Sequence, residues 1–301
     1  MDFHVTFVNN QSLLPMNVPQ PRYTLNFQGQ LLSLDTPRVM GILNVTPDSF
    51  FSGSRNLSEK DIWERVRNMV EEGVDIIDVG GCSTRPGIEL ATEEEEVKRI
   101  RLALTLIRKE WPSLPVSVDT FRSKVAALSV NELGAAMIND ISGGTMDKQL
   151  FKTVAGLQVP YILSHIQGTP ATMQVQPHYR NLVKEVVAYF SEKIAKLRDL
   201  GVNDIVLDPG FGFGKTLDQN YELLRRLPDF QLFDLPLLVG VSRKSMIYKL
   251  LNLTPEDSLN GTTTLNTLAL MQGAHILRVH DVAAAKQCVT LVQTCQKAGL
   301  C

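Results

Sequence analysis

The chain repeats one pattern eight times: a short apolar run ends near a polar residue, a loop follows, and a helical segment comes next. The runs are rich in Val, Ile and Leu without alternation, which is typical of parallel strands buried on both faces. Eight strand–helix units within about 260 residues indicate a TIM barrel, an α/β fold in which helices surround a closed ring of parallel strands. A doubly wound open sheet is the alternative, but it would usually have fewer strands and one Gly-rich loop rather than many polar strand ends.

The repeat begins after Pro37. Its strands are expected at 39–43, 75–79, 116–118, 137–138, 161–163, 205–207, 237–239 and 276–279. Helical spacing and capping residues predict helices at 59–72, 92–110, 123–133, 147–155, 179–200, 217–227, 244–251, 257–272 and 282–297. Two short runs about Gln28-Gly29-Gln30 predict a hairpin ahead of the barrel. We expect residues 1–21 to form a tail and residues 22–301 to form a single barrel domain.

Composition excludes several classes of function. The net charge of −2 gives no reason to expect nucleic-acid or anionic-membrane binding. No apolar run approaches the roughly 20 residues of a membrane span, and no signal peptide is visible. The four cysteines lack metal or redox spacing, so reduced thiols in a cytoplasm are expected.

Polar residues at the strand ends define the expected site, because barrel enzymes place their chemistry at the carboxyl ends of the strands. Three of them, Asp119, Asn139 and Asp208, suit a flat heterocycle rich in N–H donors, since a carboxylate can accept two parallel hydrogen bonds. Positive charge or donors for an anionic group come from Lys244, Arg278 and His280. The Ser83 and Thr84 hydroxyls with glycine amides could add neutral donors.

Other interpretations of the same residues remain open at this point. Asp119 could simply cap a helix, and His165 could brace its loop. The Gly-rich stretch after Asp208 ends like a P-loop, yet Pro209 stands where that motif needs its first glycine. A phosphate cradle and a shaped turn are therefore both compatible with it.

Seven segments, in order, resemble the signature motifs of the dihydropteroate synthase family. They start at Met40-Gly-Ile-Leu-Asn-Val-Thr-Pro-Asp-Ser-Phe, Asp78-Val-Gly-Gly-Cys-Ser-Thr-Arg-Pro-Gly, Val116-Ser-Val-Asp-Thr, Ile138-Asn-Asp-Ile-Ser-Gly-Gly, Asp208-Pro-Gly-Phe-Gly-Phe-Gly-Lys-Thr, Gly240-Val-Ser-Arg-Lys-Ser and Ile276-Leu-Arg-Val-His-Asp-Val. The match runs from about residue 24 to the C-terminus. The resemblance implies a TIM-barrel transferase of folate biosynthesis. It would join p-aminobenzoate to 6-hydroxymethyl-7,8-dihydropterin diphosphate, giving 7,8-dihydropteroate and diphosphate, and would be a target of sulfonamides.

The resemblance also implies roles for individual residues. The pterin would be held by Asp119, Asn139, Asp208 and Lys244. Asn44 would ligate Mg²⁺ on the diphosphate, which Thr84, Arg278 and His280 would contact. The p-aminobenzoate pocket would be framed by Ser83, Arg85, Pro86, Phe213, Lys244 and Ser245. Asp119, Asp208, Lys244 and Arg278 would be the catalytic set, and the protein is expected to be a homodimer.

The chain departs from the family pattern at three places. Cys82 stands where many members carry Glu, Ser52 where many carry Asp, and His165 lacks its usual Met neighbours. Two other functions stay in view. A corrinoid-dependent pterin methyltransferase would share the barrel but bind no diphosphate, which Lys244, Arg278 and His280 argue against. A pterin-binding paralogue without activity would be expected to have lost Asn44, Arg85 or Lys244, and it has not.

Overall fold

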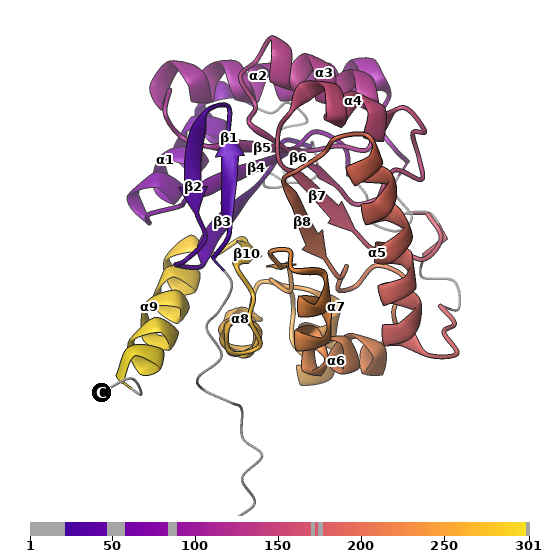
Figure 1. Cartoon of the computed structure of the whole chain (residues 1–301). Coiled ribbons are helices and arrows are strands. Elements are labelled where there is room, and N and C mark those ends of the chain that lie inside the picture. The colour runs from indigo at the N-terminus through magenta and orange to yellow at the C-terminus, as the bar shows by residue number, and fades with distance from the viewer. Residues whose placement is uncertain (1–21, 47–57, 84–88, 170–171, 174–176, 299–301) are drawn as a thin grey trace, which may run out of the picture.

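The expected barrel is present in the computed structural model, which describes residues 22–46, 58–83, 89–169, 172–173 and 177–298. Eight parallel strands are hydrogen-bonded in the order β8-β7-β6-β5-β4-β3-β10-β9 (Figure 1). Their bounds are β3 (Arg38–Asn44), β4 (Ile76–Gly80), β5 (Val116–Asp119), β6 (Met137–Asp140), β7 (Tyr161–Ser164), β8 (Ile205–Asp208), β9 (Leu238–Val239) and β10 (Ile276–Val279). A parallel bridge between Leu207 and Leu237 joins the two ends of this sheet. The alternative of an open sheet is therefore wrong.

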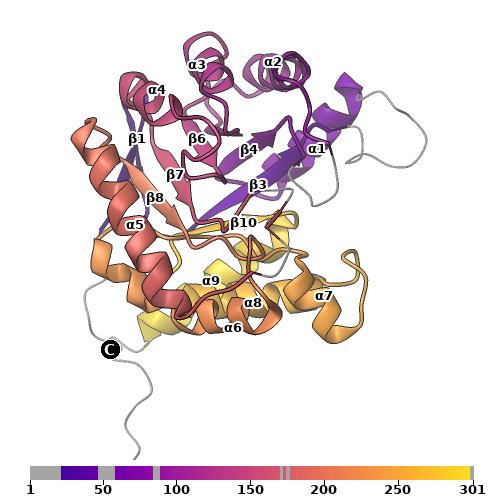
Figure 2. The ribbon, with the colours of Figure 1, turned by 90° about the vertical axis from the view of Figure 1, so that its right-hand side faces the viewer.

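Helices surround the ring, as Figure 2 shows from the side. They are α1 (Glu59–Glu71), α2 (Glu93–Glu110), α3 (Ser123–Asn131), α4 (Leu150–Leu157), α5 (Leu182–Asp199), α6 (Leu217–Arg225), α7 (Ser245–Leu251), α8 (Leu259–Met271) and α9 (Val282–Ala298). Side chains begin several of them as the sequence predicts: Thr92 and Glu95 form a reciprocal capping box at α2. The 3₁₀ helix Leu227–Phe233 after α6 was not predicted.

One helix begins later than its sequence suggests. We expected a helix from Asp147, but α4 begins at Leu150. The Asp147 carboxylate is used elsewhere: it accepts the N–H of Ser123 at the start of α3 (2.7 Å) and the N–H of Gln149 (2.8 Å). A residue that looks like a local cap thus joins two neighbouring units of the barrel instead.

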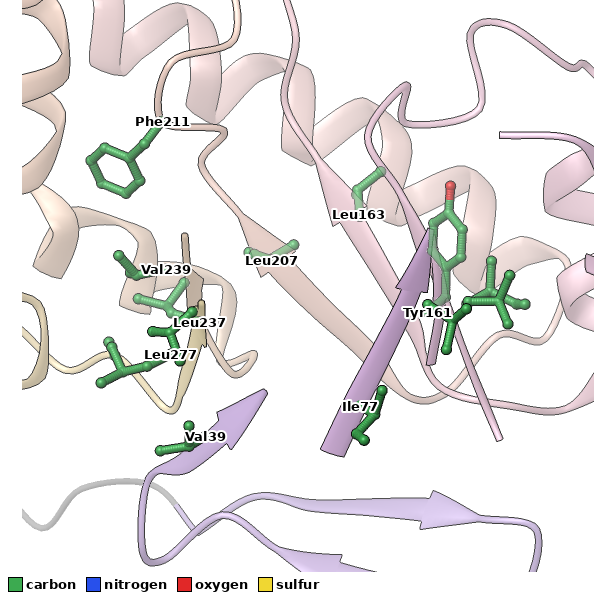
Figure 3. Packing of buried hydrophobic residues seen from close by; sticks show 14 of the residues in the cluster. Val39, Ile77, Tyr161, Leu163, Leu207, Phe211, Leu237, Val239 and Leu277 are labelled. Carbon is green, nitrogen blue, oxygen red and sulfur yellow. The ribbon is translucent and has the colours of Figure 1, made fainter. Parts of the chain in front are cut away.

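Alternate residues of each strand face opposite sides of the sheet. In β8, Ile205 and Leu207 belong to the core between strands and helices, whereas Val206 belongs to a separate core. Figure 3 shows side chains of the first core, including Val39, Leu207 and Leu277. The second core lies inside the ring and combines Met40, Ile76, Ala136, Met137, Ile162, Val206, Leu238 and Ile276 with three residues of the N-terminal segment.

The N-terminal hairpin closes one end of the ring (Figure 1). Strands β1 (Thr24–Phe27) and β2 (Gln30–Ser33) pair antiparallel, as predicted. Leu25 and Phe27 pack into the inner core, and the N–H of Asn26 donates to Asp204 (2.9 Å). The hairpin therefore plugs the amino end of the barrel and leaves the carboxyl end open.

Candidate active site

The open end of the barrel contains a cavity of about 870 Å³. One strand step above the inner core, the inward positions change from apolar to polar: Asp78 follows Ile76, and Asp208 follows Val206. The strand register sets Asn44 beside Gly80, Gly80 beside Asp119, and Asp119 beside Asn139. A layer of polar side chains therefore forms the floor of the cavity directly above an apolar plug.

A buried ion network crosses this floor. Arg278 donates from Nε to Asp78 Oδ2 (2.7 Å) and from Nη2 to Asp119 Oδ2 (2.8 Å), and Asn139 Nδ2 also donates to Asp78 Oδ2 (2.9 Å). Asp78 is fully buried, and its Oδ1 has no hydrogen-bond partner among the described residues. Asp78 thus orients both Arg278 and Asn139 toward the cavity.

Asp119 has more negative potential around it than one arginine neutralises. Burial, followed by the charges of Asp78, Glu96 and Asp140, raises the pKa of Asp119 to about 7, although Arg278 opposes the shift. A carboxylate in this state gains from any ligand that brings N–H donors or positive charge. The floor is therefore matched to a donor-rich or cationic ligand.

Asp208 lies across the floor from Asp119. Its Oδ2 accepts a hydrogen bond from Ser164 Oγ (3.3 Å) and its Oδ1 accepts the N–H of Gly210 (2.8 Å). These bonds fix the carboxylate while it still lines the cavity. Asp208 is consequently positioned as an acceptor for a ligand and is not a helix cap.

Lys244 lies on the cavity wall next to Phe213. Its Nζ donates to the carbonyl of Phe211 (2.5 Å) and sits 4.4 Å from the centre of the Phe213 ring. Burial lowers the pKa of Lys244 to about 8, and the nearby Asp208 limits the shift. The preceding residue, Arg243, has a left-handed backbone with φ of 54°, and its guanidinium is paired with Asp281 (Nη2–Oδ1, 2.6 Å).

His280 is held at the rim by Ser242. Ser242 Oγ accepts the N–H of His280 (3.2 Å) and lies 3.0 Å from His280 Nδ1. Burial and the charges of Arg278 and Arg243 lower the pKa of His280 to about 3, so the ring is neutral. Donation from the Ser242 hydroxyl to Nδ1 leaves the ring proton on Nε2, which makes Nε2 a hydrogen-bond donor.

Asn44 ends β3 and lines the same cavity. A Cβ on Gly80 would lie 3.3 Å from Asn44 Oδ1, so the glycine keeps space open beside this amide oxygen. Among the described residues no three His, Cys, Asp or Glu side chains gather as metal ligands. These features fit Mg²⁺ held by one amide oxygen together with substrate phosphates, because Mg²⁺ commonly takes few protein ligands.

Most predicted site residues converge on this cavity. Its lining includes Asn44, Ser83, Asp119, Asn139, Asp208, Phe213, Lys244, Ser245, Arg278 and His280. Thr84, Arg85 and Pro86 lie outside the described residues, as does Ser52. Cys82 also lines the cavity, and burial raises its pKa. His165 is buried behind the wall, in agreement with a bracing role.

Sequence reasoning assigned no role to Asp78 or Ser242. Asp78 could have been found, because a lone charge in the buried run Ile76–Gly80 stands at an inward position two residues after an inward isoleucine. Ser242 could not, because its contact with His280 joins residues 38 positions apart.

Comparison with known proteins assigns the family. The model of the family described as "Pterin binding enzyme" matches residues 40–280. The chain belongs to the pterin-binding enzyme family. Among curated members, the dihydropteroate synthase of Escherichia coli K12 is 44% identical over 268 residues, covering 88% of this chain and 94% of that protein. The Synechocystis dihydropteroate synthase is 43% identical over 252 residues, covering 83% of this chain and 86% of that protein.

Solved structures of pterin-binding enzymes superimpose on this one. Yersinia pestis dihydropteroate synthase, in a complex with a sulfonamide drug, matches with a TM-score of 0.86 and 38% identity over 92% of this chain and all of that one. The Xanthomonas albilineans enzyme with 4-aminobenzoic acid matches with a TM-score of 0.84 and 39% identity, covering 92% of this chain and 99% of that one. In the described part of the chain, no helix has the length and apolar character needed to cross a membrane.

Proposed function

We propose that the barrel mouth joins p-aminobenzoate to 6-hydroxymethyl-7,8-dihydropterin diphosphate, with the residues described above as its working parts. The protein is a dihydropteroate synthase by family, a transferase of folate biosynthesis. The observation that carries the assignment of roles is the pairing of an acidic floor with a cationic wall in one cavity. Such a cavity suits a ligand with a donor-rich ring at one end and an anion at the other.

The pterin ring belongs on the floor. Asp208 and Asn139 would accept and donate hydrogen bonds along its edge, and Asp119 would face the side on which positive charge develops. Their exposures of 6% for Asp208 and 3% for Asn139 suit a flat ring inserted deep in the cavity. Lys244, which bridges the Phe211 carbonyl and the Phe213 ring, would contact both substrates.

The diphosphate belongs beside Arg278 and His280, with the Thr84 hydroxyl as a further donor. Neutral His280 would donate from Nε2, and Arg278 would share its charge between Asp119 and a phosphate oxygen. We place Mg²⁺ at Asn44, where, when bound, it would neutralise phosphate charge and so improve the leaving group.

Substitution at the pterin methylene would then proceed by dissociation. The carbon–oxygen bond to diphosphate breaks and its electron pair leaves with the diphosphate. The cation left on the methylene is delocalised into the ring and stabilised by Asp119 and Asp208. The p-aminobenzoate amine adds its lone pair to the methylene carbon and releases a proton to solvent. No strong base is needed, so the site mainly positions and neutralises.

The p-aminobenzoate would lie nearer the rim, framed by Phe213, Ser245 and Ser83 together with Arg85 and Pro86. Sulfonamides, which copy its shape, would compete for the same space. In support, the Yersinia pestis relative is described with a sulfonamide drug and the Xanthomonas albilineans relative with 4-aminobenzoic acid.

Two further properties are part of the proposal. Exposed apolar side chains on α8 and α9, among them Leu268, Met271 and Leu291, favour a homodimer through this face. Light scattering on the purified protein measures that state. The three described cysteines, Cys82, Cys288 and Cys295, are free, which suits a cytoplasmic location.

The decisive test is direct synthesis. The protein is incubated with pterin diphosphate, Mg²⁺ and p-aminobenzoate, and dihydropteroate and diphosphate are measured by chromatography. We expect equal amounts of both products and competition by a sulfonamide. Binding of the pterin without either product would contradict the proposal and favour a binding protein without activity.

A further inference from the structure

Lys215 is a buried lysine that lies behind the cavity rather than in it. It is 4% exposed, and its Nζ has three partners: His165 Nδ1 (2.9 Å), the Gly210 carbonyl (2.8 Å) and the Phe213 carbonyl (3.1 Å). An ammonium group has three donors and no acceptor. Protonated Lys215 is therefore fully satisfied when His165 is neutral and accepts through Nδ1.

The ionisation of both groups agrees with this arrangement. Burial lowers the pKa of His165 well below its usual value, and the charge of Lys215 adds to the shift. Burial lowers the pKa of Lys215 to about 7, while Asp208 favours and Lys244 opposes its charge. Among the described residues no carboxylate forms an ion pair with Lys215, so its bonds to two carbonyls and one ring nitrogen stabilise it.

The loop that Lys215 holds is packed against the segment after β7. A Cβ on Gly210 would lie 1.9 Å from the His165 carbonyl oxygen, and one on Gly214 would lie 2.7 Å from the Gln167 carbonyl oxygen. Both glycines also have positive φ, 75° and 63°. The glycines therefore permit this close contact, and they do not cradle a phosphate.

The same loop carries the parts of the site that face both substrates. Asp208 accepts the Gly210 N–H, the Phe211 carbonyl accepts from Lys244, and the Phe213 ring lies against the Lys244 ammonium. Lys215 binds the carbonyls of Gly210 and Phe213 from the opposite side. The path from Asp208 to Phe213 is thus held by one lysine on each side.

We propose that Lys215, with His165 as its acceptor, is a positioning residue that fixes the Phe213 wall of the p-aminobenzoate pocket. The inference rests on the proposed function. Gly210 is also held by Asp208, so its place depends less on Lys215. Phe213 has a second backbone bond only to Gly210, from its N–H to the Gly210 carbonyl (3.1 Å). Loss of the ammonium should therefore displace the Phe213 end of the loop more than the Asp208 end.

The test separates the two substrates. Lys215→Met keeps the apolar stem and removes the three donors. We expect KM for p-aminobenzoate to rise about tenfold or more, with kcat and KM for pterin diphosphate within about threefold of the wild type. An unchanged KM for p-aminobenzoate, an equal rise in both KM values, or a fall in kcat alone would overturn the inference.

A second pair of variants keeps the test decisive if Lys215→Met does not fold. His165→Asn can present an amide oxygen to Lys215, whereas His165→Leu, of similar size, presents no acceptor. We expect only His165→Leu to raise KM for p-aminobenzoate, by about tenfold. Equal behaviour of the two variants would overturn the inference. A wild-type protein that makes no dihydropteroate would instead contradict the proposed function.

Discussion

Arg278 reaches Asp119 with one nitrogen, 2.8 Å from the carboxylate, while its Nε holds the buried Asp78. One cation therefore serves a carboxylate that faces the cavity and another that does not. The arrangement separates two roles that the sequence alone would merge. Asp119 is exposed to the ligand and can act in the reaction, whereas Asp78 maintains the geometry of the floor.

Asp119→Asn should lower activity without lowering stability. The amide keeps the shape and removes the negative charge that opposes the developing methylene cation, so we expect kcat/KM to fall by about 10²–10³-fold. The pKa of Asp119 is raised to about 7, so neutralising it costs the folded state little. Steady-state kinetics and thermal unfolding measure the two effects. Near-normal turnover in a folded variant would refute the assignment of Asp119.

Arg278→Ala should damage stability as well as activity. It leaves Asp78 buried with no cation, a situation that costs about 3–5 kcal/mol. Urea unfolding measures the change. The control is Arg278→Ala combined with Asp78→Asn, which should regain much of the loss because no buried charge remains. An equally unstable double variant would show that the network is not electrostatic in origin.

Ser242→Ala should weaken the diphosphate end of the site. Without the hydroxyl, His280 loses the group that holds Nδ1, and we expect KM for pterin diphosphate to rise about tenfold. The control is the same change in a His280→Ala background, where it should have almost no further effect. Additive losses in the double variant would mean that Ser242 acts on its own.

Stability should fall as the pH is lowered from 6.5 to 4. Burial lowers the pKa of His275 to about 4, and its Nδ1 accepts the N–H of Leu237 (3.2 Å). Between these two pH values the unfolded chain binds the proton and the folded chain does not, so folding is more favourable at the higher pH, by up to about 3 kcal/mol from this group. Urea unfolding at several pH values should show a smaller pH dependence for His275→Asn. An unchanged dependence would contradict the prediction.

Two Gly→Ala variants should change stability in opposite directions. At Gly210 the new Cβ would meet the His165 carbonyl at 1.9 Å, so we expect a loss of several kcal/mol. At Gly156, within α4, nothing lies within 4 Å of the new Cβ, and we expect a gain of about 1 kcal/mol. Thermal unfolding of both variants measures the difference. Similar losses at the two sites would mean that the close contact with His165 is not the cause.

The barrel and the floor of the site were predictable because both depend on local patterns. Apolar runs and polar strand ends fall in register only in a parallel ring, and this places Asp119, Asn139 and Asp208 in one cavity. Features that depend on contacts between distant segments were not predictable. Asp147 serves α3 instead of its own helix, and Lys215 looked like the end of a phosphate loop until its three buried partners were visible. The identity of a residue in a motif does not reveal which neighbour its side chain faces.

The hairpin at the amino end of the barrel turns the enzyme into a vessel with a single door. Leu25 and Phe27 fill the base, so both reactants enter, and both products leave, by the opening above Asp208. In such a vessel depth dictates the order of traffic. A pterin seated on the floor must arrive before p-aminobenzoate stacks nearer the rim, and the joined product can depart only after the path past Ser245 is clear.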